Sequence, residues 1–323
     1  RRIKIILTKT EIIVSGKKLS RVALGTHQFC LKTEKTSREI LDMFVANGGN
    51  LIDTARCYGE DVTRPKSPES ERCIGRWIQS SGMRDEIVLI TKGGNPEFKN
   101  GERIRNRITE NEIEADITKS LEELKTDYID IYFFHKDDPT IYPGAAIEIL
   151  NKYINYGMVK HIGASNWNTQ RIKAANKYAK EHGLAEFEFS EIAFSLKDNV
   201  TNGWGEKELV HEINFEDYQY YREIGLPVIG FGAQAYGFFY GNDIPSSTSE
   251  KNRELFRRLK NICDKKQINA HQALFGFYFG CDIKNIPLIS AKSVSRLKEV
   301  IDNCDIVLDK QEMEYLLQER FRQ

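Results

Sequence analysis

Four reactive side chains stand at the ends of three successive apolar runs in the sequence. Asp53 closes one run and Tyr58 follows five residues later, whereas Lys92 and His135 each close a later run. Taken singly, a residue of this kind more often meets solvent or makes a structural hydrogen bond. If the runs are neighbouring parallel strands of a barrel, however, their carboxyl ends lie at one rim and the four side chains converge. Their positions therefore predict one shared site.

This set of groups suits the reduction of a carbonyl. Hydride arriving at the carbonyl carbon leaves negative charge on the oxygen, which must be stabilised and protonated. A phenol has an ordinary pKa of about 10, and a neighbouring ammonium favours its ionised form and lowers that value. We therefore expect Tyr58 to supply the proton and Lys92 to lower its pKa. Asp53 would hold Lys92 charged, while His135 would donate a hydrogen bond to the substrate oxygen.

The elements that must position these groups follow from an alternation of short apolar runs with amphipathic segments. The expected strands are 22–24, 50–52, 87–91, 129–134, 159–163, 187–192, 227–231 and 286–289. The expected helices are 37–47, 70–79, 109–124, 144–156, 169–181, 215–224, 251–265, 269–279, 293–301 and 310–322. Eight strands that alternate with helices predict an α/β fold, a (β/α)8 TIM barrel formed by one domain over residues 1–323.

Other segments are expected outside the eight units or argue against a different fold. Residues 4–8 and 12–14 predict an N-terminal β-hairpin, residues 310–322 an extra C-terminal helix, and 95–108 and 197–214 long loops above the rim. A doubly wound open sheet is the alternative, but no glycine fingerprint follows the first strand. Residues 230–235 fit G-x-G-x-x-A after a later strand, yet the aromatic sequence behind them is not that of a helix, so we expect no Rossmann site there.

Composition narrows the classes of partner. The 323 residues include 47 Lys and Arg against 47 Asp and Glu, so no net positive field favours nucleic acid. No apolar stretch reaches the roughly 20 residues that cross a bilayer, and we expect no membrane partner. Neither a Cys/His cluster nor three regularly spaced hard ligands indicates a metal. The six cysteines stand singly, which is typical of free thiols and predicts a cytoplasmic protein. The oligomeric state stays open.

Several motifs together resemble the aldo-keto reductase superfamily. They are Asn-Leu-Ile-Asp-Thr-Ala at 50–55 with Tyr-Gly at 58–59, Ser-Glu-Arg at 70–72 with Ile-Gly at 74–75, Thr-Lys at 91–92, His135, and Gly-Ala-Ser-Asn-Trp at 163–167. The similarity runs from about residue 20 to 303. The resemblance implies an NAD(P)H-dependent barrel oxidoreductase whose catalytic tetrad is Asp53, Tyr58, Lys92 and His135.

The resemblance also implies where the nicotinamide would bind. Ser165 and Asn166 match residues that hold its carboxamide, Phe231 stands where an aromatic residue stacks on its ring, and Thr26 is a further contact. Glu191 departs from the family, which usually has glutamine there. A carboxylate can accept from the carboxamide NH₂ group but cannot donate to its oxygen.

The adenosine end would lie after the eighth strand. Two cations and a hydroxyl at a helix start make a phosphate site on physical grounds. By resemblance, Lys292, Ser293 and Arg296 hold a 2′-phosphate, which favours NADP(H) over NAD(H). Ser290 would lie beside them, and Glu299 would receive the adenine amino group.

The residues that flank the tetrad predict the substrate pocket. They are His27, Phe29, Arg56, Lys136, Asp137, Trp167 and Trp204. Their mixture of charge and aromatic rings favours a small polar or sugar-like carbonyl as substrate, or the matching alcohol. The alternative is an NADPH-binding redox-sensing or regulatory subunit with slow turnover. An aldolase with Lys92 as a Schiff-base lysine is disfavoured, because Asp53 would keep that lysine protonated.

Overall fold

Eight parallel strands close into a barrel in the order β3-β4-β5-β8-β9-β10-β11-β12. They are β3 (Ala23–Gly25), β4 (Leu51–Asp53), β5 (Val88–Gly93), β8 (Ile129–Phe134), β9 (Val159–Ser165), β10 (Phe189–Ala193), β11 (Val228–Phe231) and β12 (Asn285–Ile289). The structure is a computed structural model that describes residues 7–59, 68–99, 102–200, 210–241 and 244–318. The predicted (β/α)8 TIM barrel is confirmed, and each expected strand begins and ends within two residues of an observed one.

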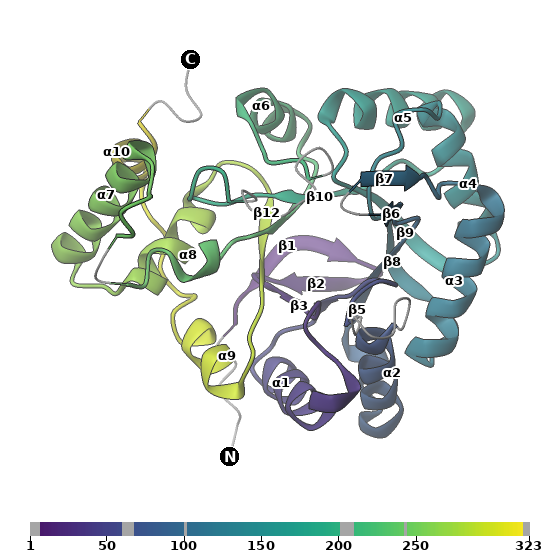
Figure 1. Cartoon of the computed structure of the whole chain (residues 1–323), viewed down its shortest axis with the longest axis horizontal. Coiled ribbons are helices and arrows are strands. Elements are labelled where there is room, and N and C mark those ends of the chain that lie inside the picture. The colour runs from purple at the N-terminus through teal and green to yellow at the C-terminus, as the bar shows by residue number, and fades with distance from the viewer. Residues whose placement is uncertain (1–6, 60–67, 100–101, 201–209, 242–243, 319–323) are drawn as a thin grey trace.

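Helices surround the barrel, as Figure 1 shows. They are α1 (Glu34–Ala46), α2 (Glu69–Ser81), α3 (Glu110–Leu124), α4 (Pro143–Asn155), α5 (Thr169–His182), α6 (Phe215–Ile224), α7 (Glu250–Lys266), α8 (Ala270–Gly280), α9 (Val294–Ile301) and α10 (Lys310–Leu317). Because helices cover the outer face of the sheet and side chains fill its interior, β5 and β8 are buried along their whole length. This explains why their sequences are continuous apolar runs rather than alternating ones.

The N-terminal hairpin forms, but its strands lie later in the chain than expected. β1 (Lys9–Val14) pairs antiparallel with β2 (Lys17–Ser20), so the turn lies at Ser15 and Gly16, which have φ of 48° and 81°. The prediction of strands at 4–8 and 12–14 was therefore wrong, because Gly16 accepts the left-handed backbone that the turn needs; residues 4–6 lie outside the described part. Val14 and Leu19 pack with Leu51 and Val88 and close the amino end of the barrel (Figure 1).

Two further segments differ from the sequence-based expectation. The stretch 95–108 contains a second hairpin, β6 (Glu97–Lys99) with β7 (Glu102–Arg105). Its strands were missed because they are charged and lack apolar alternation. Of the other long loop, residues 201–209 lie outside the described part, and Trp204 lies there with them. The last helix, expected over 310–322, ends at Leu317.

The described helices also bear on the expectation about membranes. None of the helices within the described ranges is both long enough and apolar enough to span a lipid bilayer.

Candidate active site

The ends of β4 and β5 bring Asp53, Tyr58 and Lys92 together. Lys92 and Asp53 are completely buried, and the Lys92 ammonium donates to Asp53 Oδ1. The same Nζ lies 3.2 Å from the Thr54 carbonyl oxygen and 3.3 Å from the Tyr58 hydroxyl. His135 follows β8, and its ring meets the Tyr58 ring edge-on with centroids 5.5 Å apart. The four side chains thus form one contiguous cluster.

Backbone hydrogen bonds fix the loop that carries Tyr58. The amides of Thr54 and Arg56 donate to the carbonyls of Ile90 and Lys92, both at 3.0 Å, so the β4–β5 ladder continues past the end of β4. The Tyr58 amide then turns back to Ala55 at 3.1 Å. This continuation places the phenol over the lysine.

Burial decides the protonation state of the cluster. Burial raises the pKa of Tyr58. The charge of Lys92 opposes that shift, whereas the charges of Asp53 and Glu191 add to it. Lys92 therefore acts in the expected direction, but the expected net lowering of the tyrosine pKa was wrong, because desolvation outweighs it. The phenol is protonated near neutrality and is therefore a proton donor.

The two basic groups of the cluster, Lys92 and His135, differ in charge. Although burial opposes its charge, Asp53, Glu191 and Tyr58 raise the pKa of Lys92 well above its ordinary value. Burial, Lys92 and Lys136 lower the pKa of His135 well below its usual range. The cluster thus contains a permanent ammonium beside a neutral imidazole.

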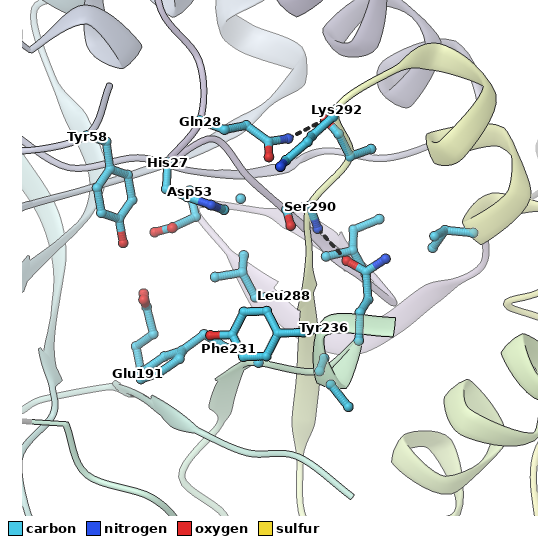
Figure 2. A pocket seen from close by; sticks show the side chains of 18 of the residues that line it. His27, Gln28, Asp53, Tyr58, Glu191, Phe231, Tyr236, Leu288, Ser290 and Lys292 are labelled. Carbon is cyan, nitrogen blue, oxygen red and sulfur yellow. Dashed lines mark hydrogen bonds between the residues drawn. The ribbon is translucent and has the colours of Figure 1, made fainter. Parts of the chain in front are cut away.

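Glu191 is a second carboxyl at this cluster. It lies on β10, is 2% exposed, and its Oε1 is 3.2 Å from Lys92 Nζ. In Figure 2 the Glu191 carboxyl, the Asp53 carboxyl and the Tyr58 hydroxyl point toward one another. The Glu191 side chain is thus engaged with the charged groups of the cluster.

A long cavity of about 940 Å³ begins at the cluster. Tyr58, His135 and Glu191 line one end, and Lys292 and Arg296 line the other. In Figure 2 Tyr58 and Glu191 lie on one side of the view and Ser290 and Lys292 on the other. The volume falls in the range of small-molecule and cofactor sites. Within the described ranges, no three His, Cys, Asp or Glu side chains are grouped to hold a metal ion.

Comparison with known sequences fits this arrangement. The sequence model of the aldo/keto reductase family matches residues 21–318. The chain belongs to the aldo/keto reductase family. It is therefore an oxidoreductase by family, and proteins of this family generally use NAD(P)H.

Named relatives of this aldo/keto reductase include oxidoreductases of fungi. It is 26% identical to a probable aryl-alcohol dehydrogenase of Saccharomyces cerevisiae, with 86% of this chain and 85% of that protein covered. It is 26% identical to a norsolorinic acid reductase of Emericella nidulans, with 93% and 78% covered. A norsolorinic acid reductase B of Dothistroma septosporum is 33% identical, but over only 48% of this chain and 39% of that protein.

Most of the cofactor residues predicted for this aldo/keto reductase line the cavity. They are Ser165, Asn166, Glu191, Phe231, Ser290, Lys292, Arg296 and Glu299. Thr26 and Ser293 are not among the described lining residues. Thr26 is fully buried and its hydroxyl donates to the Asp53 carbonyl at 2.8 Å, whereas Ser293 accepts from the Arg296 amide as the N-cap of α9. In this structure the two residues bond to the backbone of the site, and their contact with a cofactor stays a prediction.

Asn166 has structural bonds in addition to its place in the wall. Its Nδ2 donates to the His135 carbonyl at 3.1 Å, and its Oδ1 accepts from the His211 amide at 3.2 Å. Its φ is 59°, a left-handed conformation that asparagine tolerates better than most residues. A ligand that bonds to Asn166 must share or replace these contacts.

The structure places the predicted substrate-pocket residues in different settings, and the pocket itself stays a prediction. His27 and Lys136 line the cavity, but the described lining lacks Phe29, Arg56, Trp167 and Asp137. Phe29 and Trp167 belong to the hydrophobic core, because apolar rings gain more by packing than by facing a polar cleft. Arg56 pairs with buried Glu71 at 2.5 Å, and Asp137 with Arg171 at 2.7 Å.

Two glutamines of the cavity wall were missed. Gln28 donates to the Ala291 carbonyl, and Gln234 accepts from the Ser290 amide at 2.8 Å. They join the loops after β3 and β11 to the end of β12 (Figure 2). Gln234 lies in the G-x-G-x-x-A segment, which continues into a short 3-10 turn (Ala235–Gly237) and not into an α-helix. Its glycines after a barrel strand were the available signal for a loop at the rim.

The Arg56–Glu71 pair generates a stability prediction. Glu71 is fully buried and also accepts from Thr91 at 2.7 Å. Arg56→Met would leave this carboxylate without its cation, so we expect the free energy of unfolding to fall by about 3 kcal/mol, measured by urea denaturation.

Two controls separate this cost from a general effect of losing arginine. Arg76→Met breaks an exposed pair with Glu34 and should cost less than about 1 kcal/mol. Adding Glu71→Gln to Arg56→Met should restore most of the loss. Equal costs for Arg56→Met and Arg76→Met would contradict the role of the buried pair.

Proposed function

We propose that this chain is an NADPH-dependent carbonyl reductase that converts an aldehyde or ketone to an alcohol by hydride transfer. The observation that supports it most is the Tyr58 hydroxyl, 3.3 Å from the buried Lys92 ammonium, at one end of a cavity whose other end holds Lys292 and Arg296. A proton donor and a cationic end in the same trough suit a phosphorylated dinucleotide with a carbonyl beside it.

Each residue of the cluster has a separate role in the reaction. A bound reduced nicotinamide supplies the hydride. Tyr58 gives the proton of its hydroxyl to the carbonyl oxygen as negative charge develops there. Lys92 stabilises the phenolate that results, and Asp53 holds the ammonium in place. Neutral His135 donates an N–H to the same oxygen without adding a second positive charge beside Lys92.

The donor set of the cavity fits NADP(H). Lys292 and Arg296 are exposed cations at the start of α9, where a 2′-phosphate would find charge and helix N–H groups. At the other end, Ser165, Asn166 and Glu191 offer polar atoms to a carboxamide, and Phe231 offers a ring face.

The substrate we favour is a small polar or sugar-like carbonyl. The described residues of the cavity wall include His27, Asn95 and Lys136, which are polar, and the His27 ring meets the Tyr58 ring edge-on with centroids 6.3 Å apart. Aromatic carbonyls are the second candidate, because the names of relatives refer to aryl alcohols and norsolorinic acid. A panel of short hydroxyaldehydes, aryl aldehydes and long apolar ketones separates the two classes by kcat/KM.

A regulatory NADPH-binding subunit is the alternative function. It would bind the nucleotide tightly and turn over every carbonyl of the panel slowly.

We further propose that residues 1–323 form one domain, supported by the family match over 21–318. None of the six cysteines, all of which lie within the described ranges, is part of a disulfide, which supports a reducing compartment such as the cytoplasm.

The first prediction concerns the proton donor. Tyr58→Phe should lower kcat for carbonyl reduction by about 10²–10⁴-fold, the usual contribution of a positioned acid, while the Kd for NADPH stays within about threefold. Steady-state kinetics and fluorescence titration measure the two quantities. An unchanged kcat would show that another group supplies the proton.

The second prediction concerns the choice of nucleotide. Arg296→Ala should weaken NADPH binding by about 10- to 100-fold, the value of a hydrogen-bonded ion pair, and should leave NADH binding nearly unchanged. Lys298→Ala is the matched control. Lys298 is also on α9 and pairs with a carboxylate, Asp302, as Arg296 pairs with Glu299, but it is not among the described residues that line the cavity. Equal losses for NADPH and NADH in Arg296→Ala would remove the assignment to the 2′-phosphate.

A further inference from the structure

Lys92 has more acceptors around it than protons to give. Asp53 Oδ1, the Thr54 carbonyl oxygen and the Tyr58 hydroxyl all lie within hydrogen-bonding distance of its Nζ. Glu191 Oε1, at 3.2 Å, is a fourth acceptor. Because an ammonium carries three protons, the Glu191 carboxyl competes with Tyr58 for one of them.

The outer oxygens of the two carboxyl groups point to a shared proton. Asp53 Oδ2 and Glu191 Oε2 are buried, and neither accepts a hydrogen bond from a donor within the described ranges. The two carboxyls face each other (Figure 2), so one proton held between them would satisfy both oxygens. Burial and the charge of Asp53 raise the pKa of Glu191 to about 8, although Lys92 opposes the shift.

Few charges surround Glu191. Asp53 faces it from β4, Lys92 from β5 and Tyr58 from the loop after β4, while His135 beyond β8 is neutral. Its partners on the neighbouring strands are uncharged: Ser165 on β9 and Ile229 on β11. Within the described residues, Lys92 is therefore the cation that Glu191 contacts, and Asp53 already pairs with Lys92. If a second positive charge bound at this end of the cavity, the Glu191 carboxyl could pair with it.

The further inference rests on the proposed function, in which this end of the cavity holds the nicotinamide. The reduced ring is neutral, and the oxidised ring carries a positive charge. We propose that Glu191 distinguishes these two states of the nucleotide: it stays protonated beside the reduced ring and gives up its proton when the oxidised ring binds. Glutamine at this position could not do so, because an amide does not titrate in this range.

The sign of the pH dependence follows from this linkage. Below about pH 8 the free protein holds Glu191 protonated, and the cationic ring favours the ionised form. Affinity for NADP⁺ should therefore rise as the pH rises from 6 to 9, whereas affinity for NADPH should not. A shift of one pKa unit corresponds to a tenfold effect, so we expect the ratio Kd(NADPH)/Kd(NADP⁺) to increase by about tenfold. The 2′-phosphate is common to both nucleotides, and its titration cancels in the ratio.

The experiment measures nucleotide binding to the full chain. Kd for NADP⁺ and NADPH is determined by titration from pH 6 to 9, and calorimetry in two buffers of different ionisation heat counts the protons released at pH 7. The wild type should release a substantial fraction of one proton with NADP⁺ and almost none with NADPH. Glu191→Gln should remove both this release and the pH dependence of the ratio. Glu188→Gln, an exposed carboxyl just before β10 that pairs with His161, should keep them.

Each outcome bears on a separate claim. If neither nucleotide binds, the proposed function is wrong. If both bind but the ratio is flat with pH, or if Glu191→Gln keeps the pH dependence, the role of Glu191 is overturned and the proposed function stands. A second readout needs no variant: an infrared difference spectrum of the wild type should lose a protonated-carboxyl C=O band on addition of NADP⁺. Absence of that loss would also overturn the role.

Discussion

Burial of the Lys92 ammonium is the constraint on which the rest of the site depends. A charge taken out of water costs several kcal/mol unless opposite charge and hydrogen bonds surround it. Asp53, the Thr54 carbonyl and Glu191 supply that compensation from β4 and β10, and such groups meet only because the sheet closes into a barrel. The Tyr58 hydroxyl completes the shell of the ammonium. The contacts that compensate the burial of the Lys92 charge therefore also place a protonated phenol beside a permanent positive charge.

Some parts of the fold stabilise the barrel and its loops, and others carry the reactive groups. The β1–β2 hairpin closes the amino end of the barrel with Val14 and Leu19, so the reactive groups gather at the carboxyl rim. Arg56, in the loop that carries Tyr58, pairs with the buried Glu71 of α2. Gln28 and Gln234 join the rim loops to the end of β12. The cavity thus has a charged, buried end and a more exposed cationic end, and these suit the two ends of one dinucleotide.

The sequence was sufficient for what local patterns encode. Continuous apolar runs marked β5 and β8, and the polar residues that close such runs gave Asp53, Lys92 and His135. Features that depend on tertiary packing could not be predicted from the sequence. Trp167 and Phe29 follow barrel strands at the same rim as the tetrad but pack into the core, and the charged strands β6 and β7 carry no apolar alternation. The net shift of the Tyr58 pKa depends on burial from many elements. The pairing of Glu191 with Lys92 depends on β10 and β5, two strands that are not neighbours in the barrel.

The most direct test of the account follows the hydrogen itself. The protein is incubated with NADPH that carries deuterium at both C4 positions of the nicotinamide, together with the best carbonyl of the substrate panel, and the alcohol is analysed by mass spectrometry and proton NMR. The account predicts one deuterium, bound to the carbinol carbon, with the hydroxyl hydrogen taken from solvent through Tyr58. An alcohol without deuterium at that carbon would contradict the account.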